Sequence, residues 1–213
     1  MADAAEARCA AQIDDWQLRS AAMQFAAWRD ALGAHAPRWV SVALSPDADV
    51  QFVQLVQSVT QLLQQQRLAP AELELRLQQH ALTQHASAAT TLQRLRELGV
   101  RLALEGLGHA SASLSALSRL KVSSVIVDRH FVRQAPTVEA HRVLIKAITS
   151  LGASLDIVTV ADGISSDEQR CTLRELGVQL GHGALFAAPL PADGCALWLM
   201  ARSAPSGVAH HTP

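Results

Sequence analysis

Acidic residues follow three apolar runs of this chain. Glu105 follows Leu102–Leu104, Asp128 follows Val125–Val127, and Asp162 closes a third run. Such runs predict buried strands. In parallel α/β folds the chemistry lies at the carboxyl ends of the strands, where these acids are expected to meet. Carboxylates gathered there are hard oxygen ligands that could hold a divalent cation. The alternative is that water, a nearby cation or backbone amides satisfy them, and the sequence favours this simpler interpretation.

Helices must alternate with those strands to position the acids. The sequence predicts six strands and at least seven helices, because apolar residues recur at period two or at helical spacing between Gly and Pro breakers. The strands are expected at 38–44, 73–77, 102–104, 125–127, 155–160 and 178–180, with helices over 2–32, 50–66, 80–98, 110–120, 138–151, 167–176 and 193–201. This order indicates an α/β fold, an incomplete TIM-type (β/α) barrel with about two strands fewer than a closed barrel has.

Composition limits the possible functions. The chain has 213 residues, is 49% hydrophobic and carries a net charge of −1, so nothing favours nucleic acid or an anionic membrane surface as a partner. Its cysteines, Cys9, Cys171 and Cys195, have no metal-binding spacing and indicate free thiols in a cytoplasmic protein. We also expect no signal peptide and no membrane span.

Six motifs in order resemble one known family. The stretch Arg101–Val132 keeps the closing Asp-Arg-x-Phe-Val of its central region, and the others are Ile13-x-x-Trp16, Ser41-Val-Ala-Leu-Ser45, Leu73-Glu-Leu-Arg-Leu77, Ala161-Asp-Gly163 and Gly181-His-Gly-Ala-Leu-Phe186. Together they resemble the EAL family, the bacterial cyclic di-GMP phosphodiesterase domain. The resemblance implies an EAL-like domain over 13–202 that lacks its first strands, preceded by a helical extension over 1–12. The Pro/Ser/His-rich composition of residues 203–213 predicts a disordered tail.

The resemblance also implies that most of the catalytic apparatus is missing. Family members hydrolyse a phosphodiester with divalent metals held by carboxylates and an Asn. At the matching positions this chain has Ala43 for the metal Asn, Arg76 for a metal Glu, Glu105-Gly106 for an Asp pair, Ile126 for the catalytic Lys, Ser165 for a Glu and His182 for the substrate Gln. Glu105, Asp128 and Asp162 are therefore expected to be a remnant of the ancestral site, with no catalytic residue, no bound metal and no cofactor.

Two further residues have competing interpretations. Arg76 could bind a phosphate of a ligand, but an ion pair with Glu105 or Asp128 is the favoured expectation. His182 could contact a guanine base, whereas a turn histidine without a role is the simpler hypothesis. Trp16 and Trp28 lie on a predicted amphipathic helix, which favours core packing.

An open sheet leaves its two outer strands, Val40–Leu44 and Val178–Leu180, to be covered. The N-terminal segment could fold over the gap, or a second chain could cover it. Family resemblance adds a possible homodimer through helices Ala110–Leu120 and Val138–Leu151.

Three functions follow from the resemblance. The favoured one is a catalytically inactive regulatory module that acts by protein–protein interaction in bacterial signalling. The alternative is a receptor that binds cyclic di-GMP weakly without cutting it, and a residual phosphodiesterase comes last.

Overall fold

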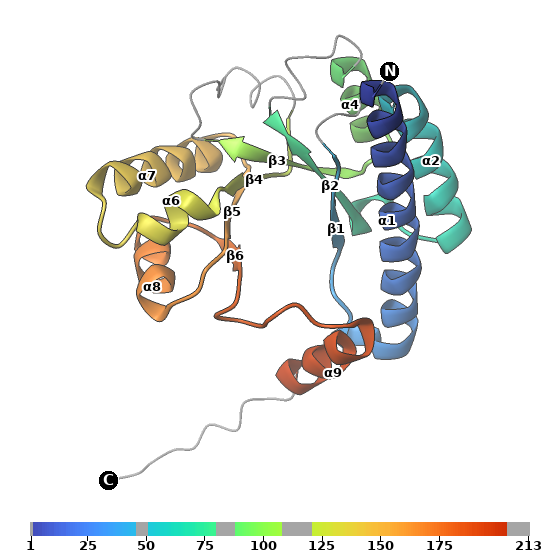
Figure 1. Ribbon diagram of the computed structural model, residues 1–213. Coiled ribbons are helices and arrows are strands. Elements are labelled where there is room, and N and C mark those ends of the chain that lie inside the picture. The colour runs from blue at the N-terminus through green and yellow to red at the C-terminus, as the bar shows by residue number, and fades with distance from the viewer. Residues whose placement is uncertain (1, 46–50, 80–87, 108–120, 204–213) are drawn as a thin grey trace.

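The computed structural model describes residues 2–45, 51–79, 88–107 and 121–203. Within them, strands alternate with helices as the sequence predicts, except between β3 and β4, where the expected helix lies outside the described residues (Figure 1). The elements are α1 (Ala2–Leu32), η1 (Gly33–His35), β1 (Val40–Ala43), α2 (Gln51–Gln66), η2 (Pro70–Glu72), β2 (Leu73–Gln78), α4 (Ala88–Glu97), β3 (Arg101–Leu107), β4 (Ser124–Val127), α6 (Arg129–Gln134), α7 (Glu139–Ser154), β5 (Val158–Asp162), α8 (Asp167–Glu175), β6 (Leu180–His182) and α9 (Ala192–Ser203).

The six strands form one parallel sheet in the order β1-β2-β3-β4-β5-β6. Each strand pairs with the next along the chain, for example through Leu75 opposite Leu102 and Val125 opposite Thr159. Figure 1 shows the sheet curving like part of a barrel wall. Since β1 and β6 each have one neighbour in this sheet, the barrel is open between them. The predicted fold class, an incomplete TIM-type barrel, is confirmed.

Period-two alternation in β2 separates the two faces of the sheet. Leu73, Leu75 and Leu77 are buried under the helices of the outer face. Glu74 and Arg76 alternate with them and line the concave inner face. A closed barrel fills that inner space with layers of branched apolar side chains. Here the inner face carries charges, which the sequence pattern of β2 already encodes.

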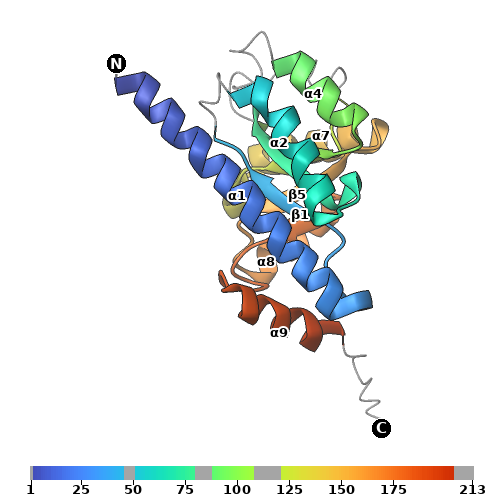
Figure 2. The same ribbon diagram turned by 90° about the vertical axis from the view of Figure 1, so that its right-hand side faces the viewer.

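Helix α1 packs against β1, and α2 packs against α1 (Figures 1 and 2). Leu18, Ala22 and Phe25 lie on one face of α1 and are buried in the core. Trp16 lies on the opposite side and is 67% exposed, so the expectation that it packs in the core is wrong. Trp28 is half-buried. The spacing of apolar residues predicted the helix correctly but could not show that two faces of it are apolar.

The opening between β1 and β6 is not covered by α1. The chain leaves β6 through residues 183–191 and enters α9, which contacts η1 and α1 (Figures 1 and 2). All three residues of β6 are exposed, as the sequence predicts for an outer strand of an open sheet.

Several boundaries differ from the predicted ones. Helix α7 continues through Gly152 to Ser154, because Gly152 is a packing position: a Cβ there would lie 2.9 Å from the carbonyl oxygen of Ile157. Strand β5 therefore begins later, at Val158, and includes Asp162. Likewise β1 begins at Val40 rather than at residue 38.

The predicted turn at residues 181–183 is also wrong in part. Gly181 and His182 belong to β6, where Gly181 pairs with Ala161 and His182 with Asp162. A Gly-His-Gly sequence is typical of a turn, but pairing with β5 determines the conformation here.

Some predictions fall outside the described residues. These are the start of the helix expected at 80–98, the helix expected at 110–120, and the tail from residue 204. Helix α1 runs without a break across residue 12, where the helical extension was expected to end, and α9 includes Ser203. The domain boundaries otherwise remain predictions. None of the described helices is long and apolar enough to cross a membrane.

A buried carboxylate joins α1 to the end of β1. Asp14 is 4% exposed, and its two oxygens accept hydrogen bonds from the Ser45 amide and the Ser45 hydroxyl, each at 2.9 Å. Burial raises the pKa of Asp14 above its ordinary value, although the Ser45 hydrogen bonds oppose this. The hydrogen bonds that Asp14 accepts therefore stabilise the fold, whereas burial of its negative charge is unfavourable.

We expect Asp14→Ala to lower the free energy of unfolding by about 1–3 kcal/mol, because both Ser45 donors lose their acceptor. Because the folded-state pKa is raised, wild type should gain stability relative to Asp14→Asn as pH falls through that pKa toward the ordinary value near 3.8. Urea unfolding at pH 7 and pH 4 measures both effects. Asp30→Ala, at an exposed site of the same helix, is the control; equal losses for Asp14→Ala and Asp30→Ala would contradict this assignment.

Candidate functional site

The carboxyl ends of β2, β3, β4 and β5 surround a cavity of about 180 Å³, which we call the mouth cavity. Parallel pairing brings these ends to one edge of the sheet. The residues lining the cavity are Arg76, Gln78, Glu105, Gly106, Ile126, Asp128, Arg129 and Asp162. The three acids that the sequence singled out therefore lie around one cavity, together with Arg76.

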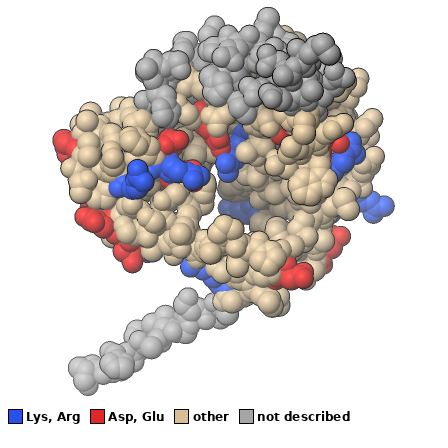
Figure 3. Space-filling view, viewed as in Figure 1, with Lys and Arg blue, Asp and Glu red and all other residues tan. Residues whose placement is uncertain are grey.

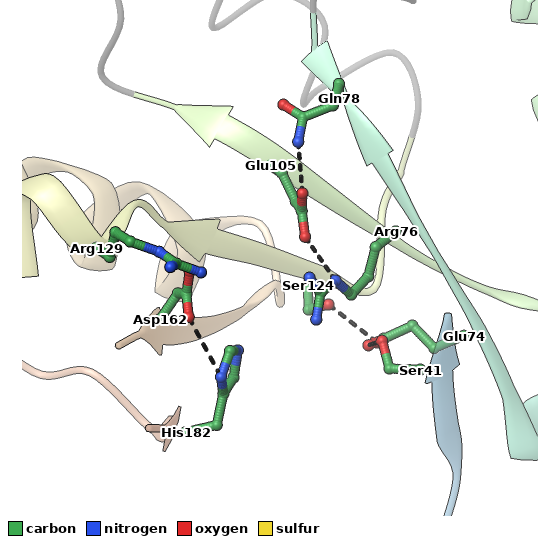
Figure 4. Close-up of polar contacts among 9 residues, drawn as sticks. All are labelled: Ser41, Glu74, Arg76, Gln78, Glu105, Ser124, Arg129, Asp162 and His182. Carbon is green, nitrogen blue, oxygen red and sulfur yellow. Dashed lines mark hydrogen bonds and ion pairs between the residues drawn. The ribbon is translucent and has the colours of Figure 1, made fainter. Parts of the chain in front are cut away.

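Glu105 is fully engaged by neighbours on β2. One oxygen accepts a hydrogen bond from Nε of Arg76 at 2.5 Å, and the other accepts from the side-chain amide of Gln78 at 2.6 Å (Figure 4). The Arg76 and Glu105 side chains are 28% and 15% exposed, so water screens the pair only partly. The predicted ion pair between Arg76 and Glu105 is confirmed.

Asp162 is engaged in the same way on the other side of the mouth cavity. It accepts a hydrogen bond from Nε of Arg129 at 3.1 Å, and Nδ1 of His182 lies 3.4 Å from its second oxygen (Figure 4). His182 thus contacts an acid of the mouth cavity. The simpler hypothesis, a turn histidine without a role, did not include this contact. Arg129 lines the mouth cavity and is not among the candidate residues of the sequence analysis, where it belongs only to the Asp-Arg-x-Phe-Val motif.

Asp128 begins helix α6. Its side chain accepts a hydrogen bond from the amide of His130 at 2.7 Å, the usual N-cap arrangement. Helix α6 has only six residues and was not predicted. The sequence signal for this helix was an acid, Asp128, that precedes the apolar pair Phe131-Val132.

The mouth residues do not fit a pair of divalent metals. Such metals need several free oxygen ligands, whereas two guanidinium groups already occupy the carboxylates of Glu105 and Asp162. Ala43 and Ile126 offer no ligand, and Gly106 has a φ of +83°, a conformation that L side chains rarely adopt. Within the described ranges, no group of three His, Cys, Asp or Glu side chains could hold a metal ion.

A second polar network lies deeper, on the inner face of the sheet. Glu74 is 5% exposed; its oxygens accept hydrogen bonds from the hydroxyls of Ser41 at 2.8 Å and Ser124 at 3.0 Å (Figure 4). Nε of Arg101 lies 3.5 Å from Glu74, and its guanidinium stacks over Trp39 at 4.3 Å from the ring centroid. Sequence reasoning missed this network, although the alternating charges of β2 were a usable signal.

An open parallel α/β sheet with acids at its carboxyl edge places the protein in the TIM-barrel class of folds. The model of the EAL domain family matches residues 1–189, and the chain belongs to that family.

Relatives agree with this assignment. The cyclic di-GMP phosphodiesterase NbdA of Pseudomonas aeruginosa is 33% identical over 181 residues, which is 84% of this chain and 23% of NbdA. The solved structure of the PaMucR phosphodiesterase in complex with c-di-GMP is 30% identical, with a TM-score of 0.78 over 85% of this chain and 73% of that one. The EAL domain of Mycobacterium smegmatis DcpA, 24% identical, shares the fold with a TM-score of 0.83 over 90% of this chain and 85% of that one. The chain therefore spans about a quarter of the length of the curated relative NbdA.

Proposed function

We propose that this chain is a catalytically inactive EAL module that regulates cyclic di-GMP signalling in the bacterial cytoplasm by binding a protein partner. The observation that carries the proposal is the neutralised mouth cavity. Arg76 pairs with Glu105 and Arg129 with Asp162, so the carboxylates that remain have cations of the protein itself as partners. A metal ion entering here would first have to displace two guanidinium groups, and their charge opposes its approach.

Exposed apolar side chains support a protein partner. Trp16 and Met23 on α1 are 67% and 58% exposed, and Leu197 and Met200 on α9 are 69% and 54% exposed. Large apolar side chains left in water on two contacting helices are typical of interaction surfaces. A second copy of the chain is one partner of this kind, so homodimerisation belongs to the proposal.

A second function, a receptor that binds cyclic di-GMP without cutting it, has one supporting observation. Arg76 and Arg129 both line the mouth cavity, and guanidinium groups bind phosphates well. The PaMucR relative was solved in complex with c-di-GMP. Against this alternative, both arginines are already paired with acids. A residual phosphodiesterase is the least supported, since it requires the metal site as well.

Calorimetric titration with cyclic di-GMP, with and without Mg²⁺, separates the two main functions. We expect no saturable heat up to about 100 μM nucleotide, a range that would reveal most specific ligand complexes. Saturable binding that weakens on Arg129→Gln would instead establish the receptor. A partner captured from a bacterial lysate by wild type and lost on Trp16→Ala or Leu197→Ala would support the regulatory module, whereas equal capture by both variants would contradict the role given to these helices.

A further inference from the structure

The concave inner face of the open sheet encloses a second cavity of about 270 Å³, which we call the lumen cavity. It lies mostly against the amino-terminal and middle parts of the strands and adjoins the mouth cavity, because Arg76 and Ile126 line both; at β6 it extends to His182. Figure 3 shows the corresponding hollow in the centre of the molecule, with basic side chains on its wall. In a closed barrel, packed side chains fill this space. The cavity is present because the sheet does not close into a complete barrel.

One wall of the lumen cavity has more hydrogen-bond donors than acceptors. Both oxygens of Glu74 already accept from Ser41 and Ser124. Among the described residues, Nε of Arg101 is buried without a hydrogen-bond partner and lies 3.5 Å from the nearer oxygen of Glu74. A guanidinium has five N–H donors and no acceptor, so this wall needs an acceptor-rich group.

Trp39 holds the donors of Arg101 in place. The guanidinium lies 4.3 Å from the ring centroid of Trp39, an arrangement that fixes its plane and leaves its edge available. A planar guanidinium edge matches a carboxylate, which can accept two parallel hydrogen bonds. Arg76 lines the same cavity, with its charge paired to Glu105.

The opposite wall is apolar. Ile126, Val158, Val160 and Leu180 of β4, β5 and β6 form most of it, and Gly181 and His182 complete it at β6. Leu180 is 41% exposed and belongs to the outer strand of the sheet, so this wall reaches the open side of the barrel. A ligand that enters there meets apolar surface on one side and guanidinium groups on the other.

We propose that the lumen cavity binds a small monocarboxylate with a short apolar body. The carboxylate accepts hydrogen bonds from Arg101, and the apolar body packs against the side chains of β4 to β6. Glu74 on the same wall repels negative charge, which disfavours a dianion more than a monoanion. The cavity is near the lower end of the usual volume range of small-molecule sites, so the ligand is small. The carboxylate site is centred on Arg101, although its cavity shares Arg76 and Ile126 with the mouth cavity, and it does not depend on the regulatory function proposed above.

Hexanoate is a suitable probe, with hexanol as the matched uncharged probe and inorganic phosphate as the matched anion without an apolar body. Calorimetry on the full chain should show saturable hexanoate binding below about 10 mM, and Trp39 fluorescence should change with the same midpoint. Hexanol and phosphate should bind at least about tenfold more weakly, because each lacks one of the two contacts. Absence of saturable hexanoate binding, or equal binding of hexanol, would overturn the proposal.

Charge substitutions at Leu180 provide the matched variants, because its partial exposure on an outer strand tolerates either charge. Leu180→Glu should weaken hexanoate binding at least about tenfold and Leu180→Lys should not weaken it, since only the sign of the added charge differs. Arg101→Gln should also abolish binding, and Arg94→Gln, at an exposed site on α4, is its control. If Arg101→Gln does not fold, comparison of hexanoate binding by Leu180→Glu and Leu180→Lys still tests the proposal. Equal effects of the two Leu180 variants, or loss of binding on Arg129→Gln at the mouth cavity, would contradict the assignment to the lumen cavity.

Discussion

Replacing Glu74 by alanine should lower the free energy of unfolding by about 3–5 kcal/mol, the cost of removing one partner from a buried charged pair. Glu74 is 5% exposed and accepts hydrogen bonds from two serine hydroxyls. Without Glu74, Arg101 keeps its charge beside Trp39. Among the described residues, Glu74 is the one carboxylate that pairs with Arg101. An unpaired charge and two donors without acceptors would remain on the inner face of the sheet.

Urea unfolding monitored by circular dichroism measures this loss. Glu74→Gln keeps an acceptor for a serine but removes the charge, so its loss should be smaller than that of Glu74→Ala. Glu97→Ala, at an exposed site on α4, should change the free energy of unfolding by less than about 0.5 kcal/mol. If Glu74→Ala were as mild as Glu97→Ala, the network on the inner face would contribute nothing to the fold.

Patterns within single elements were sufficient to predict the sheet. Leu73-Glu-Leu-Arg-Leu77 alternates strictly, and β2 spans it. The acids Glu105, Asp128 and Asp162 come together because strands in a parallel sheet end at the same edge, which is a general property of the fold. The pairing of Glu105 with Arg76 was predictable because Arg76 lies on the neighbouring strand, whereas the pairing of Asp162 with Arg129 was missed.

The misplaced elements are those in which contacts outweigh local sequence. Strand β6 has three residues, and its Gly181 and His182 have turn-like composition, so only their pairing with β5 makes them a strand. Trp16 was expected in the core, yet it lies on the side of α1 opposite the buried Phe25 and faces solvent, since apolar residues on both faces of a helix do not show which face is covered.

The inner network could not be predicted from spacing. Ser41, Glu74, Arg101 and Ser124 come from four different strands, and Trp39 precedes the first of them. Their contacts depend on the register between neighbouring strands, for example Ser41 opposite Glu74, which only the structure supplies. The alternation of leucines with Glu74 and Arg76 in β2 nevertheless indicated that the inner face of the sheet carries charge.

The largest functional effect we expect is the absence of cyclic di-GMP hydrolysis. Resemblance to the EAL family places a metal ligand at Arg76 and the catalytic Lys at Ile126, and the chain has a cation and an apolar side chain there. Loss of one group that stabilises transition-state charge typically costs about 10²–10³ in kcat. Loss of the metal site removes the activated water as well. The deficits together should place turnover below detection.

The most direct test is hydrolysis of cyclic di-GMP by this chain at high enzyme concentration, in Mg²⁺ and separately in Mn²⁺, with an active EAL phosphodiesterase as positive control. Our account predicts that the linear dinucleotide product does not form above the level of the enzyme-free sample. Turnover that requires the metal and disappears on Asp128→Ala would show that the mouth cavity still performs catalysis, and it would contradict the account.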